Sequence, residues 1–152
     1  MKKPAARSAT KITAKNRFRI ITAPSLPAPA GHYSHGTGWD DLIFVSGQLA
    51  PRPDGSHTSG EAFEVQARQA IANLLAIVEA GGGTKESILR CTAYLVGVDN
   101  WPAFNAIYAE IFGSHRPARS VVPVPHLHHG YLIEIEAIAA RIPTPARSRA
   151  KA

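Results

Sequence analysis

The sequence predicts an α+β fold in which two helices pack on one face of a single mixed sheet. Three observations predict it. Two segments carry apolar residues at spacings of three and four, which is the period of an amphipathic helix. Several short segments alternate or are rich in branched residues, as strands are, and the order of elements is β-β-α-β-α-β-β. With 152 residues, 45% of them hydrophobic, the chain is long enough to bury one core.

The first strands are predicted at residues 18–23 (FRIITA) and 41–50 (DLIFVSGQLA). Residues 24–38, between them, are rich in proline and glycine and are interpreted as an irregular loop. Side chains alternate between the two faces of a strand. In the second strand, one face would hold Leu42, Phe44 and Ser46, and the other Ile43 and Val45.

The first helix is predicted to follow a turn at Asp54-Gly55. Thr58 and Glu61 have the spacing of a capping box, which favours a helix start there, and the glycines at 81–83 favour its end. The apolar stripe expected to pack on the sheet consists of Phe63, Ala67, Ala70, Leu74, Ile77 and Val78.

A third strand is predicted at residues 87–98, where the side chains alternate in character. The second helix follows Asp99, with Pro102 near its first turn and Gly113 at its end. The buried stripe expected for this helix consists of Phe104, Ile107, Tyr108 and Ile111.

The last two strands are predicted at SVVPV (120–124) and YLIEIEAIA (131–139). The turn-like segment PHLHHG separates them, and this pattern predicts a hairpin. With the centre of the hairpin near Leu127, Arg119 would lie opposite Glu134 on one face of the sheet. The two residues would then form a cross-strand salt bridge, which is usually structural, or share a site.

Two helices can cover only one face of the sheet, yet the predicted strands carry apolar residues on both faces. A bare apolar face would be a large exposed patch on a small domain. We therefore expect other copies of the chain to bury this face, with ligand sites between subunits.

The net charge of +6 is concentrated at the ends of the chain. Residues 1–19 hold seven basic groups and no acid, residues 143–152 hold three basic groups, and between them seven basic residues face all eleven acids. Basic disordered tails are therefore predicted at 1–17 and 143–152, around a domain at 18–142. Because the domain is net acidic, nucleic-acid binding is not expected of it.

Cysteine usage and hydropathy indicate the compartment. Cys91 is the only cysteine, and the basic N-terminus is not followed by the apolar segment of a secretory signal. No apolar run has the length of a membrane span. A cytoplasmic location is the resulting expectation, and an organellar matrix is the alternative if the acid-free N-terminus is a transit segment.

Six short segments along residues 20–141 together resemble one protein family, the RidA family, also called YjgF-type reactive intermediate deaminases. The segments are GHYSHG (31–36), FVSGQL (44–49), QARQAIANLLAIVEAGGG (66–83), FNAIYAEIF (104–112), PARSVV (117–122) and IEIEAIA (133–139). The resemblance implies a chorismate-mutase-like fold and a homotrimer with sites in the clefts between subunits. It also implies hydrolysis of 2-enamines and 2-imines, such as 2-aminoacrylate, to 2-keto acids and ammonia, with no cofactor and no metal.

The same resemblance implies the site residues. Arg119 stands where the family grips the substrate carboxylate, a task suited to the planar fork of guanidinium N–H donors. Glu134 stands where the family holds the attacking water. Further positions expected to line the site are Tyr33, Ser46, Gly47 and Asn105. The chain departs from the usual pattern at His32 and His35, often Pro and Gln in the family, and at Val121, often Cys.

Other readings stay open. The histidines of HLHH (126–129) could hold a metal, although an exposed His-rich turn is commoner. The basic tails could contact RNA in an endoribonuclease or translation inhibitor. A trimer could bind a carboxylate without turnover, as a ligand-binding or chaperone-like protein. Cys91 is interpreted as a core residue rather than a nucleophile, and Glu136 as a structural partner for Arg90 or Arg141.

Overall fold

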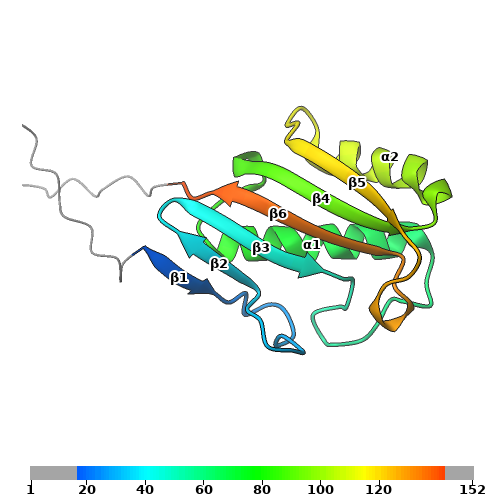
Figure 1. Cartoon of the computed structure of the whole chain (residues 1–152), viewed down its shortest axis with the longest axis horizontal. Helices are drawn as coiled ribbons and strands as arrows, with labels where there is room; N and C mark the ends of the chain where they lie inside the picture. Colours follow the sequence, from blue (N-terminus) through cyan, green and yellow to red (C-terminus); the bar gives the residue numbers. More distant parts are fainter. Residues whose placement is uncertain (1–16, 143–152) are drawn as a thin grey trace, which may run out of the picture.

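The computed structural model describes residues 17–142, which form one mixed six-stranded sheet with two helices on one of its faces (Figure 1). This arrangement confirms the predicted fold class. The predicted tails at 1–17 and 143–152 lie outside the described residues, apart from Arg17. No helix in the described range is long and apolar enough to cross a membrane.

The sheet has the strand order β1-β2-β3-β6-β4-β5. The elements, in chain order, are β1 (Phe18–Ile21), β2 (Gly36–Trp39), β3 (Leu42–Gln48), α1 (Phe63–Ala80), β4 (Ile88–Val96), α2 (Trp101–Phe112), β5 (Ala118–Val124) and β6 (Ile133–Ala140). Single 3-10 turns lie at Lys85–Ser87 (η2), Val98–Asn100 (η3) and His128–Gly130 (η4).

The core lies between the helices and the covered face of the sheet. The predicted stripe of α1 is buried in full, and it packs on alternate residues of β3 and β6. In β6, Ile133, Ile135 and Ala137 are buried while the residues between them are partly exposed. Every second residue of β6 therefore lies on the core face, as the alternation in the sequence indicates.

The helix α1 begins later than the capping box predicted. Thr58 is fully buried and its hydroxyl donates to the Ala50 carbonyl oxygen at 2.8 Å, so this side chain does not cap the helix. The helix starts at Phe63, and Ala62 occupies the N-cap position without a side-chain hydrogen bond. The capping-box prediction is therefore wrong because the Thr58 side chain binds the segment that follows β3 instead of the helix start.

Residues 24–38, predicted to be irregular, end in strand β2. This strand pairs with β1 on one side and β3 on the other, both antiparallel. His35 holds the loop that precedes it: the ring is buried, Nδ1 accepts from the Ala23 N–H at 3.1 Å, and Nε2 lies 2.9 Å from the Pro27 carbonyl oxygen. The departure from the family pattern at His35 therefore has a structural role, whereas His32 is exposed.

The closing strands do not form a hairpin, and the predicted register of Arg119 and Glu134 is wrong. Strand β4 lies between β5 and β6, parallel to β5 and antiparallel to β6 (Figure 1). Arg119 pairs with Cys91, which is fully buried, and Glu134 pairs with Tyr94, which is partly exposed. The two residues therefore lie on opposite faces of the sheet, because residues paired across strands share a face.

The uncovered face of the sheet, here called the open face, carries large apolar side chains. Its exposed members from β1, β2 and β3 are Phe18, Ile20, Trp39, Leu42 and Phe44, which retain between 38% and 66% of their accessible surface. The register places them in rows, with Phe18, Trp39 and Leu42 in one of them. Such a contiguous patch is typical of a surface that binds protein.

His35 offers a direct test of the loop geometry. We expect His35→Ala to lower the free energy of unfolding by about 2 kcal/mol, because a buried ring and two hydrogen bonds are lost. His32→Ala, in the same loop but exposed, is the matched control and should change stability by less than about 0.5 kcal/mol. Chemical denaturation followed by circular dichroism measures both, and equal effects of the two variants would contradict this role.

Candidate active site

The side chain of Arg119 lies on the helix side of β5 and is held by α2. Its Nη2 donates to Asn105 Oδ1 at 2.8 Å, and its Cζ lies 5.4 Å from the Phe104 ring centroid and 4.6 Å from that of Tyr108. Stacking of a guanidinium on aromatic rings restricts its motion and adds a cation–π attraction. We name these four residues the arginine cluster.

Arg119 has no carboxylate partner among the ion pairs of the described residues. Asn105 occupies one terminal nitrogen, and the side chain is only half-buried. The remaining N–H groups are therefore free to bind an anion. A planar carboxylate is the anion that matches two parallel guanidinium donors.

Cys91 lies beneath Arg119 as its register partner in β4. Burial raises the pKa of the Cys91 thiol, which keeps the sulfur protonated and poorly nucleophilic. This environment agrees with the interpretation of Cys91 as a core residue.

Glu134 lies on the open face, against a bulge in β3. Ser46 and Gly47 form the bulge, where the register with β6 shifts between Val45 and Gln48. A Cβ atom at Gly47 would overlap the carboxylate of Glu134, so this close approach requires glycine. We name Ser46, Gly47 and Glu134 the carboxylate cluster.

The loop that carries Tyr33 is fastened to the same bulge. The Ser46 hydroxyl donates to the Ser34 carbonyl oxygen at 2.7 Å, and the Ser46 N–H donates to the His35 carbonyl oxygen at 3.0 Å. Tyr33 itself retains 54% of its accessible surface. The structure therefore brings the Tyr33 loop to the carboxylate cluster but leaves the Tyr33 ring facing solvent.

The electrostatics around Glu134 favour its protonated form. Burial raises the pKa of the Glu134 carboxyl, the neighbouring Glu136 carboxylate raises it further, and His128 acts in the opposite direction. A carboxylate with a raised pKa is a better proton acceptor, because basicity rises with pKa.

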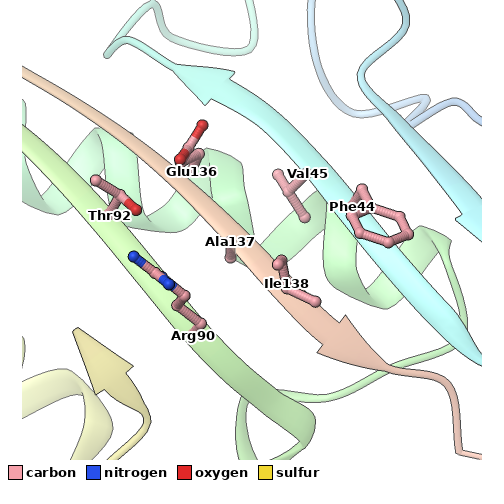
Figure 2. Close-up of a pocket in the computed structure, with 7 residues that line it drawn as sticks. All are labelled: Phe44, Val45, Arg90, Thr92, Glu136, Ala137 and Ile138. Carbon is pink, nitrogen blue, oxygen red and sulfur yellow. The ribbon is translucent and has the colours of Figure 1, made fainter. Parts of the chain in front are cut away.

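Glu136 does not form the predicted ion pair. Its Oε1 lies 3.5 Å from the Tyr94 hydroxyl, and Arg90 instead lies 3.5 Å from the Ser120 hydroxyl. Figure 2 shows Arg90 and Glu136 on neighbouring strands, along a hollow of about 310 Å³ in the open face. Both charges therefore line a surface depression without meeting at hydrogen-bond distance.

The sequence-predicted site residues thus fall into two clusters. Asn105 lies beside Arg119 on the helix side, while Ser46, Gly47 and the Tyr33 loop lie beside Glu134. Strand β4 separates β5 from β6, so their backbones are roughly 10 Å apart across the sheet. One chain does not bring the two clusters together.

The histidines of the HLHH segment lie between β5 and β6, shortly before the start of β6. The His129 ring centroid is 5.2 Å from that of His57, whose Nδ1 lies 2.8 Å from the Tyr131 hydroxyl. Within residues 17–142, no three His, Cys, Asp or Glu side chains are arranged to hold a metal ion. His57 therefore contacts His129 and Tyr131, and within residues 17–142 these contacts are not part of a metal-ligand cluster.

Two members of the arginine cluster were interpreted from the sequence only as core residues. Phe104 and Tyr108 are buried, as their helical spacing predicts, but their rings also support Arg119. The available signal was Asn105, the proposed site position between them in the same helix. The predicted hairpin places Arg119 opposite Glu134, away from this helix, so it does not indicate a contact between Arg119 and the two rings.

The family model described as Endoribonuclease L-PSP matches residues 23–141, which is most of the described chain. The chain belongs to this family, the RidA (YjgF-type) family. The RidA resemblance drawn from six short segments is therefore confirmed.

Named relatives of this RidA chain have several descriptions. It is 36% identical over 120 residues to Protein HMF1 of Saccharomyces cerevisiae, covering 79% of this chain and 92% of that protein. It is 35% identical over 131 residues to a 2-iminobutanoate/2-iminopropanoate deaminase of Capra hircus, covering 86% of this chain and 95% of the deaminase.

Solved structures of RidA relatives have the same fold. The YjgF gene product of E. coli superposes with a TM-score of 0.76 at 35% identity, and E. coli TdcF with bound serine with a TM-score of 0.77 at 31% identity. Each comparison covers 82% of this chain and 99% of the other.

Because Glu136 and His128 shift the pKa of Glu134 in opposite directions, removing each of them should shift that pKa in opposite directions. Glu136→Gln should lower the pKa of Glu134, because a neighbouring negative charge is removed, and His128→Ala should raise it. The measurement is an NMR titration of the Glu134 side-chain carboxyl in the two variants and the wild type. Shifts of the same sign in both variants would contradict the electrostatic account.

Proposed function

We propose that this RidA protein hydrolyses 2-enamines and 2-imines of α-keto acids to 2-keto acids and ammonia, without a cofactor. The observation that carries the proposal is the guanidinium of Arg119, ordered by Asn105 and two aromatic rings yet without a carboxylate partner in the described chain. Deaminase names among the relatives support this activity, and the serine bound to TdcF supports a small ligand that carries a carboxylate.

The proposed reaction begins with binding of the substrate carboxylate by Arg119, which fixes the imine carbon in place. Glu134 holds a water molecule and accepts one of its protons as the oxygen adds to the imine carbon. Glu134 passes this proton to the nitrogen of the resulting amino alcohol, the carbon–nitrogen bond breaks, and ammonia leaves while the hydroxyl group loses its proton to Glu134 and becomes the keto oxygen. The products are a 2-keto acid and ammonia, and no electrons are transferred to a second compound.

We propose a homotrimer with the active site between subunits. Arg119 and Glu134 lie on opposite faces of one sheet, so one substrate can meet both only if they come from different copies. The apolar open face supports assembly, because it would otherwise remain in water. In this site Asn105 orients Arg119, Ser46 and Gly47 position Glu134, and Tyr33 covers the substrate.

The charge of the described domain favours this activity over a ribonuclease. Residues 17–142 hold nine basic and eleven acidic side chains, so the described domain is net acidic, whereas an excess of basic side chains is typical of a domain that binds a phosphate backbone. The location that we propose is the cytoplasm, or an organellar matrix if the N-terminus is a transit segment.

Arg119→Ala should lower kcat/KM for 2-aminoacrylate hydrolysis by about 100-fold or more, because a charged, paired hydrogen bond to the carboxylate is lost. Arg119→Lys should retain part of the activity, since its point charge remains but the fork is absent. The assay generates the substrate with a dehydratase and follows keto-acid release. Arg68→Ala, which removes an exposed arginine bound to Glu110, is the control. Full activity of Arg119→Ala would contradict the proposal.

A mixing experiment tests whether the site is shared. Arg119→Ala and Glu134→Gln should each be nearly inactive, but trimers reassembled from equal amounts of both should regain about one quarter of the wild-type sites. Such a site takes Arg119 from one variant and Glu134 from the other. The measurement is keto-acid release after refolding the mixture, with each variant refolded alone as control. Absence of recovery in mixed trimers of confirmed composition would contradict a site shared between copies.

A further inference from the structure

A second hollow, of about 250 Å³, begins at Arg119 and lies between the edge strand β5 and the start of α2. Alternate residues of β5, namely Arg119, Val121 and Pro123, form one wall, because they point to the same side of the strand. Val98 of η3 and Trp101 of α2 form the other wall. Leu95, the register partner of Pro123, forms the floor.

The lining of this hollow is apolar except at one end. Arg119 is its only charged residue, and the other five are Leu95, Val98, Trp101, Val121 and Pro123. Val98 retains 67% and Trp101 retains 49% of its accessible surface. A ligand with a carboxylate at one end and an apolar group at the other would therefore satisfy Arg119 and cover both exposed side chains.

The dimensions fit a ligand of amino-acid size. The hollow is smaller than the pockets of about 300–1,000 Å³ that hold drug-sized molecules. From Arg119 to Pro123 the strand rises roughly 13 Å. A carboxylate held at Arg119 thus leaves room for a branched or aromatic side chain along Val121 towards Trp101, whereas the single methylene of 2-aminoacrylate would leave the apolar walls in water.

We propose that this hollow is the side-chain pocket of the enzyme, and that its preferred substrates are 2-imines with large branched aliphatic or aromatic side chains. This inference rests on the proposed function and deepens it by naming the substrate class. Val121 contributes a branched apolar wall at the position two residues after the arginine, next to the substrate carboxylate. Trp101 is the residue that discriminates large from small side chains.

The test compares imines formed in situ from alanine, leucine and phenylalanine by an amino-acid oxidase with catalase. Semicarbazide in the assay traps the imine, and a lower rate of semicarbazone formation in the presence of the enzyme reports hydrolysis of the imine. Wild type should show kcat/KM values for the leucine and phenylalanine imines at least about tenfold above that for the alanine imine. Trp101→Ala should reduce these ratios by about tenfold, and Trp101→Phe should retain most of the preference. Val65→Ala, an exposed apolar residue of α1 outside both the hollow and the open face, should keep the wild-type ratios.

A binding experiment separates this inference from the proposed function. Calorimetry on wild type and Trp101→Ala compares pyruvate with 4-methyl-2-oxopentanoate and phenylpyruvate, and wild type should bind the two larger keto acids at least about tenfold more tightly. Tighter binding of the two larger keto acids by wild type, lost in Trp101→Ala, would support the pocket. If in addition no imine were hydrolysed, the proposed function would be overturned but the pocket would not. Hydrolysis without a preference for large imines, or equal binding of all three keto acids, would overturn the pocket and leave the function standing.

Discussion

The insertion of β6 between β3 and β4 is the constraint on which the arrangement of this molecule depends. Because β4 and β5 are joined through α2, they run parallel, and the helix side of β5 faces α2. The last strand then pairs antiparallel with β4 on its other side. This order directs Arg119 towards the helices and Glu134 towards the open face, so the two charges that a single hairpin would neutralise stay apart.

Each charge is held in place by its own surroundings and not by the other charge. Arg119 is fixed by ring stacking and one amide, which restrict its rotamers before any ligand arrives. Glu134 is pressed against the backbone at Gly47 and partly desolvated beside a second carboxylate. An ordered, unneutralised charge loses little entropy on binding, and a desolvated carboxylate gains more from a proton than an exposed one does.

Local patterns in the sequence were sufficient for the two helices, most strands and their core faces, but not for strand β2 or for the pairing of strands. The apolar stripe of α1 and the alternation in β6 are set by periods within one element, and both were predicted correctly. The hairpin was wrong because residues 125–132 resemble a turn, whereas a segment of this length can also cross β4. The short strand β2 was missed because GTGW lacks branched apolar residues and forms between β1 and β3 through backbone pairing.

The edge strand β5 also determines how the sheet ends. Its free side would offer backbone donors and acceptors to any other strand, but Pro123 has no N–H to give. Proline in an edge strand thus interrupts the ladder along which sheets would add to one another and form fibres. The residue that lines the proposed pocket on one side therefore also weakens the free edge of the sheet as a template for a further strand.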